Sequence, residues 1–325
     1  MSSHTSNTIS RYVMAEGVSP SGREKVKTDD PLDRSLLLPL SSHSKAGIGL
    51  EFVSDFFTQK EHVGLTIMHI PPSQAAVWVE ETSYESLDIL ETRTAASDMK
   101  GRKVLDAAKR KLKAAGFDPE KIEDKIAPPQ MSKAHDIIRE AREGRFNAVV
   151  LGHRAQGGLA DLMDHSVCRD MLEGLADSIS FPLWVCRLPE RGRKNVLLCV
   201  DDSDPSDRMA DHVGFMLALE PGHTVTVFHV HDPVKSAPMD AEAIVDHTIE
   251  VLTEAGLPID RIAVMIRRGS NPARLIQDEY TAGKYAAVAI GSAGSDRGFW
   301  NRMFIGSVAQ TVFKGLHGAA LWVCF

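Results

Sequence analysis

The stretch Val288-Ala289-Ile290-Gly291-Ser292-Ala293-Gly294 decides the fold, together with Gly306-Ser307-Val308-Ala309-Gln310 further along the chain. An apolar run that ends abruptly at a glycine is typical of a buried parallel strand at its carboxyl end. Gly291 and Gly294 allow backbone amides to approach a ligand closely, and Ser307 is a favourable residue for a helix start. A helix amino terminus beside a glycine turn suits a phosphate group, although a tight strand-to-helix turn explains the same residues.

The composition limits the classes of function. The chain has 325 residues, enough for two domains of ordinary size, and a formal net charge of -7. It contains no basic stripe with interleaved aromatic residues, so we expect no nucleic-acid partner. The cysteines form no CxxC pair, which argues against zinc and against a disulfide framework and favours a reducing compartment. They are Cys168, Cys186, Cys199 and Cys324.

Hydropathy and the amino-terminal sequence indicate where the protein resides. No apolar run approaches the length of a membrane span, and the amino terminus has no apolar signal core. We therefore expect a cytoplasmic protein without a membrane span. Residues 1–31 are rich in Ser, Thr, Lys and Asp and show little periodicity, which predicts a flexible arm.

From Leu32 onward the sequence repeats itself. The matched segments are 35–42 with 195–202, 65–70 with 225–230, 114–117 with 254–257 and 146–152 with 285–291. The spacing is 160 residues for the first two pairs and 140 for the third, because the first copy has a longer connection around 74–100. We therefore predict two tandem domains, 32–190 and 191–325, joined by a short linker at 188–194.

Each copy alternates strand patterns with helix patterns. In the second copy the strands are expected near 195–201, 223–230, 261–267, 286–291 and 319–324, and the helices near 206–219, 240–255, 271–282 and 306–315. Apolar, β-branched strands separated by amphipathic helices predict a parallel sheet covered on both faces. With right-handed crossovers, each domain becomes a doubly wound α/β domain of five mainly parallel strands, flavodoxin-like or Rossmann-like.

The carboxyl ends of two strands are expected to form one crevice. Ligands of doubly wound sheets lie beyond the strand carboxyl ends, where the strand order reverses. Asp201 follows the first strand of the second copy and Gly291 ends the fourth, and flavodoxin-like topologies can make these ends neighbours. The crevice would then have an acid on one side and glycines on the other.

These residues resemble the universal stress protein family, and the chain looks like a tandem member. In nucleotide-binding members an Asp ends the first strand, His-Val ends the second, and the pattern G-x2-G-x9-G-[ST] follows the fourth. Asp201, His229-Val230, Gly291-x2-Gly294 and Gly306-Ser307 are similar to these elements. The resemblance covers the chain after residue 31.

The resemblance implies a role for each matching residue. The carboxylate of Asp201 would accept hydrogen bonds from ribose hydroxyls, and the backbone of Val230 would meet adenine. The glycine loop and the following helix start would hold ribose and phosphates, with Mg²⁺ as a companion of the nucleotide. The candidate residues are Asp201, Val230, Gly291, Ser292, Gly294, Gly306, Ser307 and Val308.

The phosphate loop departs from the family pattern in length. Eleven residues, Ser295–Ile305, separate Gly294 from Gly306, where the pattern has nine. Arg297 or Arg302 could pair with a phosphate, whereas Phe299 and Trp300 could occlude the site or pack on the other domain.

The first copy is a degenerate version of the same site. Its acid position is Ser41, and its second and third glycine positions are Ala155 and His165. Each change adds a Cβ where close backbone approach is needed, so we expect no nucleotide there. His165 is adjacent to Ser166, but no Asp or second His stands at a spacing that would complete a catalytic set, so we expect no catalysis there.

Two histidines recur at the same position of the repeat. His69 and His229 each stand alone near the end of a strand, in different copies. A histidine paired with a backbone carbonyl explains them better than a metal site does.

Three function classes remain in competition. The first is a stress-response module that binds ATP, ADP or AMP in the second domain, with slow hydrolysis at most. The second is a non-nucleotide ligand-binding or protein-interaction module that uses the same crevice or surface. A true enzyme ranks last, because no Walker lysine or G-x-G-x-x-G turn follows a first strand and no general base is legible.

Both copies end in Leu-Trp-Val-Cys, at Leu183–Cys186 and Leu321–Cys324. The resemblance implies that this fifth strand lies at a sheet edge, where an exposed apolar strand is an aggregation hazard. We therefore expect the two last strands to pair antiparallel, so that one chain mimics a dimer and buries both tryptophans. Further homo-oligomerisation stays open at this stage.

Overall fold

The computed structural model describes residues 34–41, 47–72, 84–153, 167–175, 178–234, 238–292 and 307–325. The predicted arm 1–31 therefore lies outside the described residues. Within these ranges, no helix has the length and apolar character needed to cross a bilayer.

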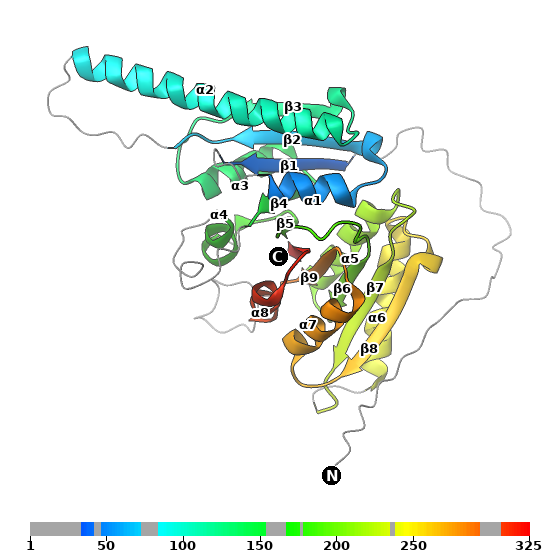
Figure 1. The fold of residues 1–325 in the computed structure, drawn as a ribbon. Coiled ribbons are helices and arrows are strands. Elements are labelled where there is room, and N and C mark those ends of the chain that lie inside the picture. The colour runs from blue at the N-terminus through cyan, green and yellow to red at the C-terminus, as the bar shows by residue number, and fades with distance from the viewer. Residues whose placement is uncertain are drawn as a thin grey trace, which may run out of the picture.

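The strands of the described ranges form one continuous sheet (Figure 1). Its order is β3-β2-β1-β4-β5-β10-β9-β6-β7-β8, so both halves have the same strand order about the β5–β10 junction. Every neighbouring pair is parallel except β5 with β10. The strands are β1 Arg34–Leu40, β2 Val63–His69, β3 Ile122–Ile126, β4 Ala148–Gly152, β5 Leu183–Cys186, β6 Val196–Val200, β7 Val225–His231, β8 Ile262–Arg268, β9 Ala287–Gly291 and β10 Ala320–Cys324.

Helices cover both faces of the sheet. Those of one face, with their buried side chains in one core cluster, are α1 Ile48–Phe56, α2 Tyr84–Ala114, α5 Asp204–Leu217 and α6 Pro238–Glu254. Those of the other face, which belong to a second cluster, are α3 Lys133–Gly144, α4 Val167–Arg169, α7 Pro272–Gly283 and α8 Ser307–Gly315. Shorter turns of helix are η1 Lys60–His62, η2 Pro119–Lys121, η4 Asp170–Gly174 and η6 Ile259–Arg261.

The sequence prediction of a doubly wound α/β fold is confirmed. Successive side chains of β1 alternate between the faces, with Leu36 and Leu38 in one core cluster and Leu37 in the other. All strands and helices expected in the second half are present, with their ends shifted by a few residues. The packing of both faces explains why the strands read as continuous apolar runs.

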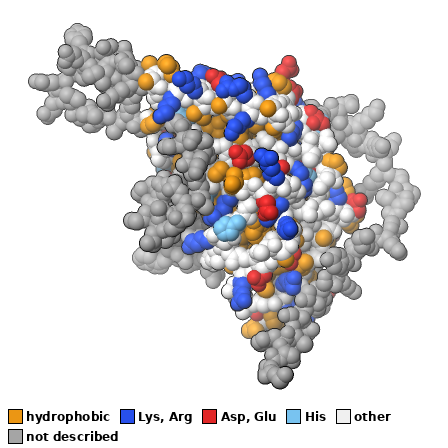
Figure 2. All heavy atoms as spheres, in the orientation of Figure 1, with side chains coloured by type: hydrophobic (Ala, Val, Ile, Leu, Met, Phe, Trp, Pro, Cys, Tyr) orange, Lys and Arg blue, Asp and Glu red, His pale blue; other side chains and the backbone are white. Residues whose placement is uncertain are grey.

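The longer connection of the first half is largely helical. α2 has 31 residues, against 17 in α6 at the corresponding place, and it extends well beyond the sheet (Figure 1). Lys and Arg side chains gather over the part of the molecule that carries α2 (Figure 2). The buried residues Leu105, Ala108 and Leu112 of α2 pack against the sheet.

The two halves join through their last strands, as predicted. β5 and β10 pair antiparallel, with Trp184 opposite Trp322. Both indoles are fully buried and stack with ring centroids 3.9 Å apart and planes 4° apart. Phe56 packs edge-on against both rings. This aromatic cluster fills the junction on the face covered by α1 and α5.

One histidine of α5 completes the cluster. The indole Nε1 of Trp184 donates a hydrogen bond of 3.0 Å to Nε2 of His212, so that nitrogen carries no proton. Burial lowers the pKa of His212 to about 3, which keeps the ring neutral. The repeat spacing places Phe52 at the corresponding position of the first half, and the buried Nε1 of Trp322 has no partner in the described part of the chain.

The lowered pKa of His212 predicts a specific acid sensitivity. The unfolded chain binds this proton near pH 6.5 and the folded chain only near 3, so the stabilisation is complete above pH 6.5 and declines as pH falls. The loss approaches about 1.4 kcal/mol for each pH unit. Urea unfolding of His212→Phe should therefore lose less stability between pH 6.5 and 4 than the parent chain does. Burial also lowers the pKa of His223, to about 4, but this residue is present in both chains and its contribution cancels in the comparison. Parallel pH profiles of the two chains would contradict the assignment to His212.

A second contact between the halves is a buried ion pair. Glu220, in the turn after α5, is fully buried and accepts hydrogen bonds from the backbone amides of Thr58 at 2.8 Å and Gln59 at 3.2 Å. Nη1 of Arg34 lies 3.9 Å from its carboxylate. Among the described residues, none of the three guanidinium nitrogens of Arg34 has a hydrogen-bond partner, and burial lowers the pKa of Arg34. Glu220 therefore compensates the buried positive charge of Arg34.

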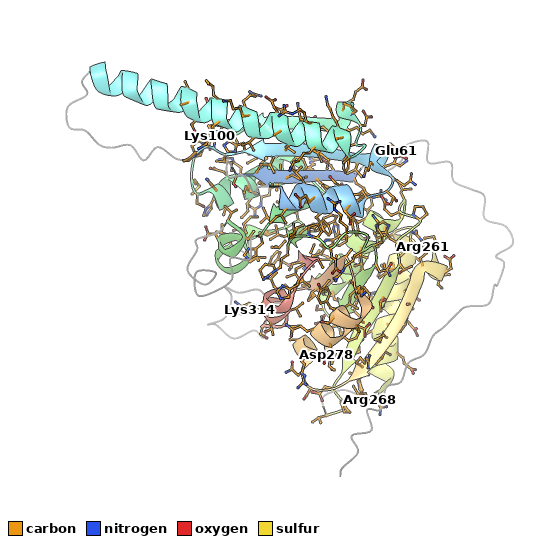
Figure 3. All side chains as sticks on the ribbon, viewed as in Figure 1. Glu61, Lys100, Arg261, Arg268, Asp278 and Lys314 are labelled. Carbon is orange, nitrogen blue, oxygen red and sulfur yellow. The ribbon has the colours of Figure 1, made fainter. Side chains whose placement is uncertain are left out.

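Removing Glu220 should be strongly destabilising. Glu220→Ala leaves the buried Arg34 uncompensated and frees two backbone donors, at an expected cost of about 3–5 kcal/mol in the free energy of unfolding. Glu61→Ala is the matched control, because Glu61 is largely exposed (Figure 3) and its removal should cost under about 1 kcal/mol. Equal urea midpoints for the two variants would show that the buried pair contributes nothing.

Candidate functional site

The carboxyl ends of β6, β7 and β9 lie side by side in the second half. β6 pairs with β7 on one side and with β9 on the other. The chain thus adds β7 and β8 on one side of β6 and then continues with β9 on the other side, so the strand order reverses between β6 and β9. The neighbourhood expected of Asp201 and Gly291 is therefore present. The β6–β7 ladder ends at the Val200–His229 pair, whereas β7 continues beside β8 to His231. Asp201 thus follows β6 between the ends of β7 and β9.

Asp201 is held at the start of α5 by two serines. Its backbone amide donates to the hydroxyl of Ser206 at 3.1 Å, and its carboxylate accepts from the hydroxyl of Ser203. Ser203 also caps α5, since its hydroxyl accepts the amide of Ser206 at 3.4 Å. The side chain of Asp201 is exposed, so an oriented carboxylate is presented at the crevice.

A hollow of about 270 Å³ lies beside Asp201, between α5 and α6. Its polar lining residues are Asp201, Asp202, Asp207, Asp240 and His247. The Nε2 atom of His247 lies 3.4 Å from the carboxylate of Asp207. Such a wall attracts hydroxyl donors and cations and repels phosphate. Within the described ranges, no group of three or more His, Cys, Asp or Glu has the arrangement of a metal site.

Gly291 is required by packing as well as by the expected turn. A Cβ at this position would lie 2.3 Å from the amide nitrogen of Ser206 and 2.5 Å from the carbonyl carbon of Pro205. Only glycine therefore lets the first turn of α5 approach the end of β9. Gly152 ends β4 in the same way, with its virtual Cβ 3.2 Å from the amide of Gly49.

The other candidate residues of the second half have mixed environments. Val230 is half-buried and packs on the core cluster that includes α7 and α8. The amide of Ser292 donates to the carbonyl of Cys324 at 2.7 Å, so this donor is already used. Ser307 is exposed and is the first residue of α8, and Val308 is half-buried.

Several predicted residues lie outside the described ranges. They are Gly294 and Gly306, the loop residues Arg297, Phe299, Trp300 and Arg302, and Ala155, His165 and Ser166 of the first half. In the first half, Ser41 directly follows β1 and is exposed. His153, after β4, packs its ring edge-on against Phe313 of α8, with centroids 5.0 Å apart.

The recurring histidines are packing residues, as predicted. Nδ1 of His69 lies 2.9 Å from the carbonyl oxygen of Leu40, and Nδ1 of His229 lies 2.9 Å from that of Val200. Both rings are buried. Each therefore ties the end of a second strand to the end of the first.

Sequence reasoning missed the acidic hollow. Asp202 and Asp207 come from the turn after β6 and from α5, whereas Asp240 and His247 come from α6. The available signal was the helical spacing of residues 240, 243, 244 and 247, which places them on one face of α6. That this face meets Asp201 depends on how α6 packs.

Comparisons with known proteins agree with the fold. Residues 192–319 match the model of the universal stress protein family. A universal stress protein from Archaeoglobus fulgidus DSM 4304 is 19% identical, with a TM-score of 0.63, and the match covers 90% of this chain and 97% of that one. A putative universal stress protein from Pseudomonas aeruginosa UCBPP-PA14 is 15% identical, with a TM-score of 0.52 and coverages of 90% and 94%.

A shorter structure matches part of the chain. The universal stress protein from Archaeoglobus fulgidus in complex with dAMP is 19% identical, with a TM-score of 0.31, and the match covers 41% of this chain and 98% of that one. A search of curated protein sequences found no match.

The packing role of Gly291 predicts a loss of stability on substitution. Gly291→Ala places a methyl group against backbone atoms of α5 that cannot rotate away, at an expected cost of about 1–3 kcal/mol. Gly222→Ala is the control, because a Cβ there meets nothing within 4 Å. The two variants should be compared by thermal unfolding. A Gly291→Ala chain as stable as the control would show that the space beside β9 is larger than this geometry allows.

Proposed function

Because residues 192–319 match the model of the universal stress protein family, we propose that the chain is a stress-response protein whose second half binds ATP or a related adenine nucleotide. The observation that carries the proposal is the exposed carboxylate of Asp201, held by Ser203 at the reversal point between β6 and β9. Ligands of doubly wound sheets bind at this point.

Each part of the nucleotide has a chemically suitable partner in this proposal. Asp201 accepts the ribose hydroxyls, and the acidic hollow beside it favours such donors over phosphate. The backbone at Val230, where β7 extends beyond β6, meets the adenine edge. The phosphates lie toward Gly294, Gly306 and the exposed first residue of α8, Ser307, where unpaired amides and the helix dipole favour anions.

In this proposal, the first half of the chain carries no nucleotide. Residues 32–190 and 191–325 are two copies of one domain, and the first copy has no nucleotide site because Ala155 and His165 replace glycines. Mg²⁺ accompanies the nucleotide and is held mainly by its phosphates. The sequence pattern assigns a general base to none of these residues, and the proposal therefore includes slow hydrolysis at most.

One observation favours a second candidate function. The hollow beside Asp201 has four carboxylates in its lining, and the amide of Ser292 is already bonded to β10. Both features weaken phosphate binding close to β6. They favour a neutral or cationic ligand in the same crevice, without a nucleotide.

Calorimetric titration separates these functions. With ATP and Mg²⁺ we expect one site per chain, and dAMP is a second probe because a family member has been solved with it. Asp201→Asn should weaken binding about 10-fold or more, since a carboxylate accepting two hydroxyls is replaced by an amide. Gly294→Val should abolish binding while the chain stays folded.

Two matched variants serve as controls. Ala155→Val makes the change of Gly294→Val at the corresponding position of the first half, and Asp278→Asn removes an exposed carboxylate of α7. Neither should alter the affinity. A stoichiometry of two would overturn the argument about Ala155 and His165. Absence of binding by ATP, ADP, AMP and dAMP would favour the non-nucleotide function.

A further inference from the structure

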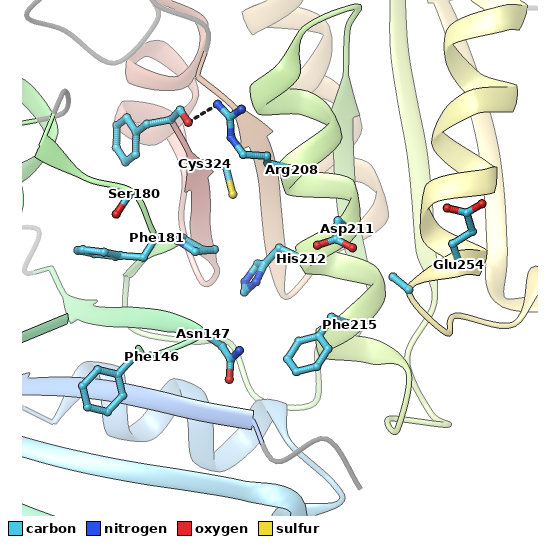
Figure 4. A pocket seen from close by; sticks show the side chains of 13 residues that line it. Phe146, Asn147, Ser180, Phe181, Arg208, Asp211, His212, Phe215, Glu254 and Cys324 are labelled. Carbon is cyan, nitrogen blue, oxygen red and sulfur yellow. Dashed lines mark hydrogen bonds between the residues drawn. The ribbon is translucent and has the colours of Figure 1, made fainter. Parts of the chain in front are cut away.

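A second cavity lies where the two halves meet, at the end of the sheet beside α5, and its lining comes from both core clusters (Figure 4). Its volume is about 530 Å³, within the usual range of sites for small organic molecules. Its walls come from the segments before β4 and β5, from α5, and from the ends of α6 and β10. It shares no lining residue with the acidic hollow beside Asp201.

The cavity has aromatic side chains from both halves. Phe146 and Phe181 come from the first half, before β4 and β5, and Phe215 comes from α5 of the second half. Phe181 is buried, and the other two rings are half-buried. An apolar or aromatic group placed here would remove the two half-buried rings from water, and these rings belong to different halves.

The charges of the lining favour a cation. Asp211 of α5 and Glu254 of α6 both contribute carboxylates, and neither is ion-paired within the described part of the chain. Among the described lining residues Arg208 is the only Lys or Arg, and it donates a hydrogen bond to the backbone oxygen of Phe325 (Figure 4). The described side chains of the lining therefore carry two negative charges against one positive charge that is already engaged.

The neutral state of His212 preserves this balance. The ring lines the cavity and is 6% exposed, and its Nε2 accepts the indole proton of Trp184. Because the pKa of His212 is lowered to about 3, the ring adds no positive charge near neutral pH. It also links the cavity to the stacked tryptophans of the junction.

We propose that this cavity binds a small organic cation, an amine attached to an aromatic ring. The ring lies against Phe146, Phe181 and Phe215, where a cation also interacts favourably with aromatic faces. The ammonium group lies toward Asp211 and Glu254. The ligand bridges the halves across the β5–β10 junction and stabilises their association.

A pair of probes that differ only in charge tests the proposal. 2-Phenylethylamine carries an ammonium group at neutral pH, and 2-phenylethanol is its neutral counterpart. By calorimetry we expect the amine to bind at one site with a Kd on the order of 1 mM, and the alcohol to bind about 10-fold more weakly. Phenylacetate, the anionic counterpart, should not bind.

Variants of the lining separate charge from aromatic packing. In Asp211→Asn combined with Glu254→Gln, the amine should lose its 10-fold advantage over the alcohol. Phe215→Ala should weaken both probes to a similar extent. Asp278→Asn, an exposed carboxylate of α7 on another part of the surface (Figure 3), is the control and should change neither affinity.

An amine advantage that disappears in the double carboxylate variant supports the proposal. Failure of the amine to bind up to about 10 mM, equal affinity of amine and alcohol, or an advantage that survives in the double variant would overturn it. Because Asp211 and Glu254 are both exposed, the double variant is expected to fold, and its circular dichroism and urea midpoint verify this.

Discussion

The antiparallel pairing of β5 with β10 is the interaction on which the rest of the structure depends. Each half alone would end in a Leu-Trp-Val-Cys strand with one unpaired edge, an arrangement that invites association with other chains. Pairing converts two such edges into the centre of one sheet and brings Trp184 onto Trp322. The Glu220–Arg34 contact and the aromatic cavity exist only because the halves meet there.

α5 connects this junction with the candidate site. Its first turn lies against Gly291 and is capped by the serine that also holds Asp201. Two turns further on, His212 accepts the indole proton of Trp184. This 14-residue helix packs as a rigid element. A displacement of the helix would therefore change the geometry at the strand carboxyl ends and at the junction together.

The sequence was sufficient to predict the fold because its main signals are local or repeated: strand periodicity, helix spacing and a duplicated pattern. The pairing of the last strands followed from the need to cover an apolar edge. At Gly291 the sequence indicates either close approach of a ligand or a tight strand-to-helix turn, and its packing against α5 does not follow from the sequence because the direction of a missing Cβ requires the fold. The partnership of Arg34 with Glu220 joins residues 186 positions apart, and no local pattern indicates it. Gly294 and Gly306 remain predictions.

The difference between Phe52 and His212 has an evolutionary consequence. In a symmetric dimer of separate chains, any residue beside the central tryptophans occurs twice, so a histidine that accepts one indole would be duplicated at the other. Joining the copies in one polypeptide removes this constraint, and each side of the pseudo-axis can change alone. Here one indole has an acceptor and the other has none among the described residues. Covalent linkage thus allows the two halves to differ beside the tryptophans while they keep a common interface.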